Sequence, residues 1–586
     1  SPFLKVLSES EVAKTLKLMN RPASTRLTPE AARDLCQRAG SKAYIAGAIG
    51  SLGTKYVLEL KAVNCQSGDE LADEQEMAAS KENVVDVLGK VASHLRGELG
   101  ESLPTVQKFD VSLAEMTTSS LDALKAFTLG RQTLIEKGEA AALPYHLRAI
   151  ELDPSFAVAY RAVGADYFGM GEIGRASEYY TKAFQLRDHT SEREKLFITT
   201  AYYGTVTGEL DKALQAYQEG IQNFPRDPAY TGLGNVYSEL GQYEKAAESY
   251  RESLRLNQDS GIPYGNLAFS LLALQHFDEA MRIIQQAQAR KLDDFVLREA
   301  LYAIAFVKGD RSAMAEHQQW FADKPTFENY GLALASDTEA YFGHLNKARD
   351  LIRKAANSAV REDNKEGGAV YLSAAALQQA AYGNAKESRQ FVSNAMKLAP
   401  ASPGVESIAA LAFAMAGEKA RAESLARDLT KRFPLDTQKR SLWLPAIRAQ
   451  LALGHNNPAE ALHDLPASSP LEFGLIPFVI NPSCLYVGYI RGETYLAAGQ
   501  GYPAAAEFQK ILDHPGIVWN CWTGALAHLG VARANVLQSK TTQGAEADAA
   551  RVRALTAYKE FFALWKDADP DIPVLKQAKA EYAKLQ

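Results

Sequence analysis

The hydrophobic positions of this chain repeat with a fixed period between Asp227 and Asp294. Two consecutive blocks of about 34 residues place large apolar and small residues at matching positions. The first block carries Tyr230, Leu233, Gly234, Tyr237, Ala246 and Tyr250, and the second carries Tyr264, Leu267, Ala268, Leu271, Ala280 and Ile284. This spacing predicts a helix, a short turn and a second helix in each block.

The repeated block resembles the tetratricopeptide repeat family. Its small residues, such as Gly234 and Ala246, fall where the two helices of a pair cross, and its aromatic residues fill the space between neighbouring pairs. The resemblance implies a mainly α fold, namely a right-handed α-solenoid in which each helical pair buries its apolar face against the next pair.

The repeats are expected over residues 119–439, and degenerate repeats with C-terminal capping helices over residues 440–586. Past Phe295 the apolar pattern weakens, but the turn glycines Gly309, Gly343, Gly383 and Gly417 keep a near-regular spacing. At about 34 residues per unit, this gives roughly eleven or twelve helical pairs.

Residues 1–100 do not follow the repeat. Thr28 followed by Pro29 predicts the start of a helix, because threonine caps helices and proline suits the first turn. Beyond Ala43 the period becomes that of strands, and the segment from Tyr56 to Leu60 alternates in polarity. Ser80 opens a further helix. We therefore predict a small α+β domain and a linker over residues 101–118.

The stretch LTPEAARDLCQRAGSKAYIAGAIGSLGTKYVLELKAVNCQSGD resembles the TolB-like domain that precedes tetratricopeptide repeats in bacterial signalling proteins. In that family a further strand and helix come before the position of Ser1. The resemblance implies that the domain is truncated at its N-terminus.

Composition excludes some classes of function. The net charge of −6 and a pI near 6.0 do not give the basic footprint of a nucleic-acid-binding protein. No apolar run is long enough to span a membrane, and the N-terminus, SPFLKVLSES, lacks the layout of a signal peptide.

The four cysteines fall as two pairs at opposite ends of the chain, Cys36 with Cys65 and Cys484 with Cys521. None has metal-binding spacing. They are either buried thiols in a reducing compartment or two disulfides in an oxidising one.

No catalytic, phosphate-binding or metal-binding motif occurs, so we expect neither an enzyme nor a cofactor. The histidines are scattered. The three tryptophans Trp519, Trp522 and Trp565 are expected in the core rather than on a ligand platform. A catalytic site in the irregular region 465–525 would need convergent polar residues that the sequence does not reveal.

One pair of asparagines suggests a binding groove. Asn235 and Asn266 occupy positions at which tetratricopeptide modules that grip a peptide's terminal carboxylate carry asparagine, and two amides in one groove could hydrogen-bond a peptide. The cations of such a clamp are replaced here by Thr231, Val296 and Glu299. We predict a groove for a neutral peptide segment that also includes Thr231 and Phe269; alternatively, the asparagines only satisfy neighbouring helices.

The segments KFDVSLAEMTTSSLDALKAFTLGR and WKDADPDIPVLKQAKAEYAKL resemble the sensor region of tetratricopeptide-bearing serine/threonine protein kinases of acidobacteria. That resemblance implies a non-catalytic ligand-sensing region, periplasmic or extracellular, that binds a protein or peptide. One alternative is a surface protein that self-associates through its solenoid. Another is a cytoplasmic regulator of a transcription or cyclase module.

Overall fold

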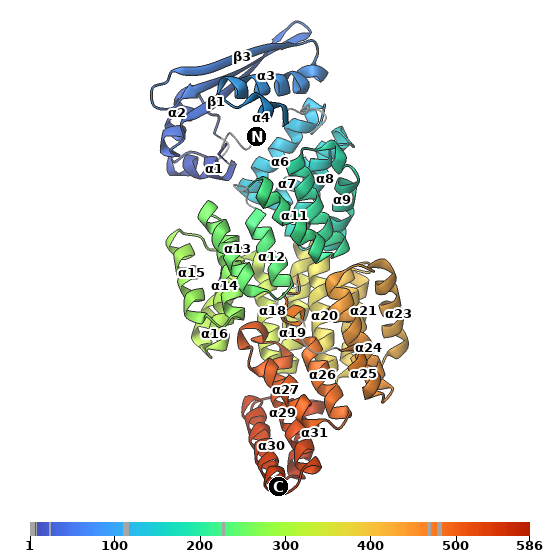
Figure 1. The fold of residues 1–586 in the computed structure, drawn as a ribbon. Coiled ribbons are helices and arrows are strands. Elements are labelled where there is room, and N and C mark those ends of the chain that lie inside the picture. Colours follow the sequence, from blue (N-terminus) through green and yellow to red (C-terminus); the bar gives the residue numbers. More distant parts are fainter. Residues whose placement is uncertain are drawn as a thin grey trace. The chain divides into compact units, whose positions relative to one another are not determined.

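The structure of the protein, a computed structural model, describes residues 6–7, 9–22, 25–108, 117–224, 229–465, 470–477 and 483–586. Contacts along the chain divide it into two compact units, Ser1–Val206 (unit 1) and Thr207–Gln586 (unit 2). Figure 1 shows the elements of each unit. The division falls inside the predicted repeats, and the domain limits drawn from sequence at residues 100, 118 and 439 stay predictions.

Unit 1 contains an antiparallel sheet of three strands, as the alternating pattern predicts. Strand β1 (Ala43–Leu52) pairs with β2 (Lys55–Asn64), and β2 pairs with β3 (Glu70–Ala78). The spatial order therefore follows the chain, which is typical of strands joined by tight turns.

Three helices accompany the sheet, α1 (Glu9–Leu18), α2 (Pro29–Arg38) and α3 (Val84–Glu98). The predicted start of α2 is confirmed, since the hydroxyl of Thr28 accepts a hydrogen bond of 3.3 Å from the backbone N–H of Ala31. Helix α3 packs on β2 and β3, and β1 is left largely exposed.

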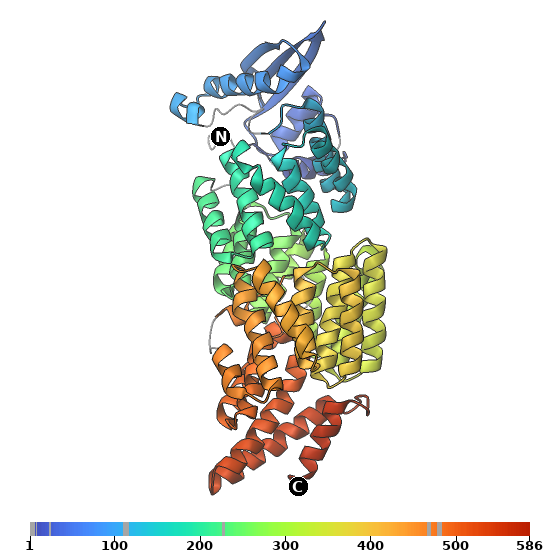
Figure 2. The same ribbon diagram turned by 90° about the vertical axis from the view of Figure 1, so that its right-hand side faces the viewer.

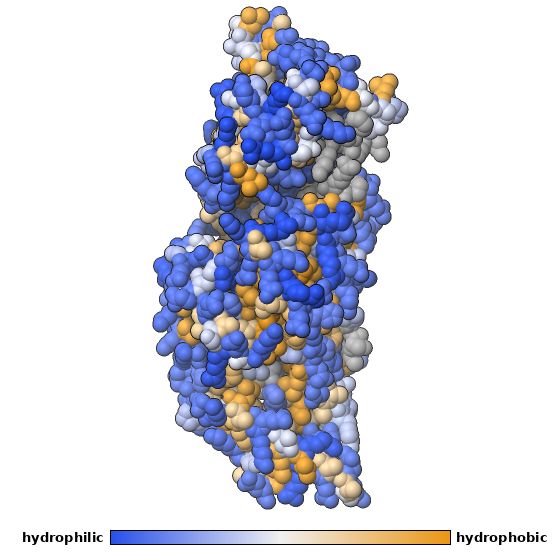
Figure 3. All heavy atoms as spheres, turned by 90° about the vertical axis from the view of Figure 1, so that its left-hand side faces the viewer, coloured by the Kyte–Doolittle hydropathy of each residue, from blue (hydrophilic) through white to orange (hydrophobic). Residues whose placement is uncertain are grey.

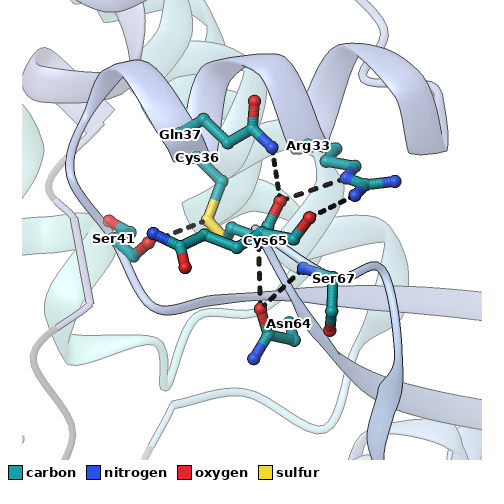
Figure 4. Close-up of a disulfide and its surroundings, with 8 residues drawn as sticks. Arg33, Cys36, Gln37, Ser41, Asn64, Cys65 and Ser67 are labelled. Carbon is teal, nitrogen blue, oxygen red and sulfur yellow. Dashed lines mark hydrogen bonds between the residues drawn. A yellow bond between two sulfur atoms is a disulfide. The ribbon is translucent and has the colours of Figure 1, made fainter.

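A disulfide between Cys36 and Cys65 joins α2 to the end of β2, with the two Cα atoms 5.9 Å apart. Around it, the side-chain amide of Gln37 and the guanidinium of Arg33 donate to the carbonyl of Cys65, at 2.7 and 3.1 Å (Figure 4). The end of β2 is thus fixed to the helix covalently and by hydrogen bonds.

The expected linker is partly helical. Helix α4 (Leu103–Lys108) lies within the range 101–118 that the sequence assigns to a linker, and the linker itself stays a prediction. Its remainder, residues 109–116, lies outside the described residues.

Antiparallel helix pairs follow in unit 1. They are formed by α6 (Leu121–Lys137) with α7 (Glu139–Leu152) and α8 (Ala157–Gly169) with α9 (Ile173–Gln185), and α10 (Glu192–Ala201) begins the next. Small residues lie at the crossings as predicted. A Cβ atom added to Gly164 of α8 would lie 2.6 Å from the ring of Tyr180 on α9.

Unit 2 continues the pairs. The helices are α11 (Leu210–Asn223), α12 (Ala229–Glu239), α13 (Tyr243–Leu256), α14 (Gly261–Ala273), α15 (Phe277–Ala289), α16 (Phe295–Val307), α17 (Arg311–Ala322), α18 (Pro325–Tyr341), α19 (Leu345–Arg361), α20 (Lys365–Ala381), α21 (Ala385–Leu398), α22 (Pro403–Met415), α23 (Lys419–Arg432), α24 (Leu444–Gly454), α25 (Pro458–Asp464), α26 (Tyr486–Ala497), α27 (Gly501–Leu512), the short α28 (Pro515–Val518), α29 (Trp522–Thr541), α30 (Ala545–Leu564) and α31 (Pro573–Ala583). Within the described residues, eleven pairs of consecutive helices pack together: α6 with α7, α8 with α9, the eight pairs from α12 with α13 to α26 with α27, and α29 with α30. The predicted α-solenoid with a small N-terminal α+β domain is confirmed.

Unit 2 also folds back on itself. The backbone N–H of Thr437 donates to the carbonyl of Gly208 at 2.9 Å, and that of Leu475 donates to Ser238 at the same distance. The hydroxyl of Tyr243 donates to the carbonyl of Phe473 at 2.7 Å. Residues more than 200 positions apart therefore meet where helical pairs turn.

The same contact recurs further along the chain. The side-chain amide of Gln275 donates to the carbonyl of Asp513 at 2.8 Å, and the backbone N–H of Asp569 donates to the carbonyl of Gly343 at 3.0 Å. The C-terminal part of unit 2 consequently lies against the turns of earlier pairs instead of only lengthening the array. Figure 2 shows the orange segments against the green and yellow helices.

Buried ion pairs anchor the irregular segment that makes some of these contacts. The guanidinium of Arg491 on α26, which is fully buried, donates to the carboxylates of Glu472 at 2.7 Å and Glu507 at 2.9 Å. Glu472 belongs to the 3-10 turn η5 (Pro470–Phe473). Since removing one partner would strand a buried charge, these pairs fix the position of η5.

A substitution at Gly516 tests whether unit 2 folds back on itself. A Cβ atom added to this buried residue of α28 would collide with the backbone carbonyl of Leu272, at the end of α14. We expect Gly516→Ala to lower the free energy of unfolding by about 2 kcal/mol, because backbone yields less easily than a side chain. The matched control is Gly404→Ala on α22, where the nearest atom would lie 3.9 Å away. Urea titrations followed by circular dichroism measure both, and equal stabilities of the two variants would contradict the contact.

Candidate functional site

The two predicted groove asparagines lie on neighbouring pairs and contact each other. The side-chain amide of Asn266 on α14 donates to the side-chain oxygen of Asn235 on α12 at 3.0 Å. The hydroxyl of Tyr250 on α13 donates to the same oxygen at 2.8 Å. Within the described part of the chain, no hydrogen bond involves the amide nitrogen of Asn235 or the amide oxygen of Asn266. The pair therefore has one unused donor, the amide nitrogen of Asn235, and one unused acceptor, the amide oxygen of Asn266. Both residues are partly exposed.

The other two predicted residues have different surroundings. The hydroxyl of Thr231 lies 2.7 Å from that of Ser253 on α13, so it is engaged within its own pair. The ring of Phe269 lies 6.4 Å from the ring of Trp519, measured between centroids. Phe269 therefore sits at the contact between α14 and the segment after α28.

Carboxylates without a cationic partner lie on the helices that follow. Across the described residues, neither Glu299 of α16 nor Asp337 of α18 makes a hydrogen bond or an ion pair. Burial raises the pKa of Glu299 to about 8 and that of Asp337 to about 7. For Glu239 of α12, burial and then the charge of Asp436 raise the pKa to about 8. These three carboxylates of unit 2 thus hold their protons to unusually high pH.

Tyrosines surround Asp337. Its charge helps to raise the pKa values of Tyr302, Tyr371, Tyr382 and Tyr486, in each case after the larger effect of burial. They come from α16, from α20 and its end, and from α26, so three elements place tyrosines within range of the charge of one carboxylate.

Asp337 also lines a cavity. The space open to the centre of a water-sized sphere is about 20 Å³, which accommodates one water-sized group. The lining residues are Asp337, Ile352, Val370, Tyr371, Ala374, Gln378, Cys484, Tyr486, Cys521 and Trp522.

The second disulfide forms part of this wall. It joins Cys484, just before α26, to Cys521, just before α29, with the Cα atoms 5.7 Å apart. The hydroxyl of Thr523 adds a hydrogen bond of 2.6 Å to the carbonyl of Cys484. Both cysteines are buried, so the structure forms the two cysteine pairs that the sequence allowed.

The tryptophans are core residues, as expected. Trp519, Trp522 and Trp565 are each almost fully buried. Trp522 nevertheless stacks on Tyr486, with ring centroids 5.8 Å apart, and lines the cavity.

The described residues contain no group of three or more histidine, cysteine, aspartate or glutamate side chains suited to hold a metal ion. Nor does any helix among them have the length and apolar character needed to cross a membrane.

Comparisons with known proteins agree with the repeat architecture. Residues 228–260 match the family model described as tetratricopeptide repeat. The chain is 27% identical over 158 residues to Protein bimA of Emericella nidulans, which covers 27% of this chain and 19% of that protein. It is 25% identical over 166 residues to anaphase-promoting complex subunit 3 of Schizosaccharomyces pombe, covering 27% of this chain and 24% of that one.

Among solved structures, the chain is similar to a thermophilic tetratricopeptide protein of Thermus thermophilus. The alignment covers 33% of this chain and 99% of that protein's chain, at 22% sequence identity and a TM-score of 0.27. The chain spans less than a quarter of the length of the two curated relatives. It carries a tetratricopeptide repeat at residues 228–260 within an array of helical pairs, and proteins with such repeats generally act as scaffolds for protein interactions.

Sequence reasoning missed the cavity. Its polar members, Asp337 and Gln378, come from different pairs, and Trp522 follows the irregular segment. The one sequence feature that pointed to this region was the pair Cys484 and Cys521, which line the cavity.

The inner carboxylates link the stability of unit 2 to pH. Because burial raises their pKa values in the folded state, their contribution to stability is complete below the unfolded values of 3.8 and 4.5 and is lost as the pH rises through about 7 and about 8. Asp337→Asn and Glu299→Gln should each raise the free energy of unfolding by about 2 kcal/mol near pH 9, after allowance for partial exposure.

The gain should shrink toward zero as the pH falls to about 4, in urea titrations at a series of pH values. Glu316→Gln, on the exposed side of α17, controls for the loss of one negative charge. A gain that stays constant over the whole pH range would contradict burial of these carboxylates.

Proposed function

We propose that unit 2 is a non-catalytic module that binds an extended segment of a protein partner at the asparagine pair formed by Asn235 and Asn266. The observation that carries this proposal is the free donor and free acceptor of that pair. A peptide unit offers one carbonyl and one N–H, which such a pair can bind together.

Two carboxylates without a cationic partner in the described residues indicate what kind of segment can bind. Glu299 and Asp337 lie on the following pairs, and neither has a counter-ion in the described residues. A terminal carboxylate would lack charge-assisted donors there. The segment should therefore bind through its backbone and through neutral or basic side chains. On the face drawn in Figure 3, apolar residues form patches among hydrophilic ones over the helices of unit 2, which suits side chains of mixed polarity.

We further propose that the protein is the ligand-sensing part of a bacterial signalling protein outside the cytoplasm. Two disulfides support an oxidising compartment, since such bonds are rare in the cytosol. They favour the sensor over a cytoplasmic regulator. The TolB-like resemblance of the N-terminal region is in keeping with this role.

Selection of peptides from a random display library on the full chain tests the binding proposal. Asn235→Asp keeps the acceptor oxygen used by Tyr250 and Asn266 but removes the free donor. We expect it to weaken the selected peptide about tenfold, which corresponds to the loss of one hydrogen bond. Gln285→Ala, on the exposed side of α15, is the control. Failure to select any peptide would refute the site. So would equal affinities of Asn235→Asp and Gln285→Ala for the selected peptide.

A further inference from the structure

The cavity beside the Cys484–Cys521 disulfide is polar on one side and aromatic on the other. The carboxylate of Asp337 on α18 and the amide of Gln378 on α20 face it from neighbouring pairs. Tyr371 and Trp522 form its aromatic side, together with Tyr486. Because α18, α20, α26 and α29 all contribute, the fold of unit 2 assembles this site.

Several polar groups at the cavity have no partner in the described chain. The side chain of Gln378 is on a residue only 3% exposed, and no hydrogen bond engages it. Trp522 is 4% exposed, and its indole N–H is buried without an acceptor. Asp337 has no cation. Acceptors held away from water without a donor cost free energy, so the carboxylate of Asp337 and the side-chain oxygen of Gln378 at one cavity point to a ligand that donates hydrogen bonds to them.

The geometry restricts that ligand to a small cation. A water molecule would fit the space but would not neutralise Asp337. A guanidinium group is larger than the one water-sized group that the cavity admits. A primary ammonium has the size of water, carries the opposite charge to Asp337 and gives three donors. Aromatic rings attract such a charge through their faces.

We propose that this cavity binds a primary ammonium group, supplied by a lysine side chain of the bound protein segment or by a free alkylamine. The carboxylate of Asp337 and the side-chain oxygen of Gln378 accept hydrogen bonds from it, and Tyr371, Tyr486 and Trp522 enclose it. The lysine source rests on the proposed peptide binding, whereas the free amine does not.

Isothermal titration of the full chain with ethylammonium chloride near pH 8, against matched sodium chloride, tests the site. We expect saturable binding that is at least tenfold weaker in Asp337→Asn, because the variant keeps the shape of the side chain but loses its charge. Gln378→Leu should also weaken it. Glu316→Gln is the charge control, and tetramethylammonium should not bind because it exceeds the space. Absence of saturable ethylammonium binding, or unchanged binding in Asp337→Asn, would overturn the proposal.

The two sources are separated with a display-selected peptide that contains lysine, compared with the same peptide carrying norleucine instead. We expect the replacement to weaken binding about tenfold. If ethylammonium binds and no peptide is selected, the ammonium site stands and the peptide-binding proposal fails. If the norleucine peptide binds equally well, a lysine side chain does not supply the ammonium group. If a peptide binds while ethylammonium does not, the peptide-binding proposal survives and the ammonium site falls.

Discussion

The hydrogen bonds between the turns of early helical pairs and segments more than 200 residues later are the constraint on which unit 2 depends. In a simple solenoid each pair contacts only its neighbours, so stability is a sum of local terms. Here Gly208, Ser238 and Gly343 each accept a hydrogen bond from a backbone N–H of a later segment. These contacts couple distant pairs and make the array cooperative over a longer range.

Folding back also determines the chemistry of the interior. Phe269 contacts Trp519, and Asn520 donates to the carbonyl of Leu334 at 3.2 Å and to the hydroxyl of Thr338 at 3.0 Å, so the later segment covers α14 and α18. Side chains that would face open water in an extended solenoid become partly buried. Asp337 and Glu299 therefore hold protons to higher pH than free carboxyls do. The enclosed site and the raised pKa values have one cause.

The sequence predicted local structure well and distant contacts poorly. The period of the repeats, the cap at Thr28 and the strand around Leu58 are short-range signals, because each depends on residues within one element or its neighbour. Turn glycines such as Gly309 and Gly417 were also identified, and both have positive φ, which glycine tolerates best. The short helix α4 was not predicted, because a segment of that length carries little periodicity.

What the sequence could not show is which segments meet after the chain folds back. Residues 465–525 lack a clear repeat, yet η5, α28 and Trp519 within them make contacts with α12, α14 and α16. The cavity combines side chains from five helices, of which α18, α19 and α20 are consecutive and α26 and α29 come more than 100 residues later. Asn235 and Asn266 were placed together because they lie one repeat apart, whereas no fixed offset links Asp337 to Trp522.

Hydrogen exchange of backbone amides in the full chain tests the folding back most directly. The amides of Thr437, Leu475 and Asp569 have their hydrogen-bond acceptors in the distant turns at Gly208, Ser238 and Gly343. We expect these amides to exchange as slowly as those inside the surrounding helices. Exchange at the rate of exposed loops, with the helices still protected, would show an ordinary extended solenoid and contradict the account.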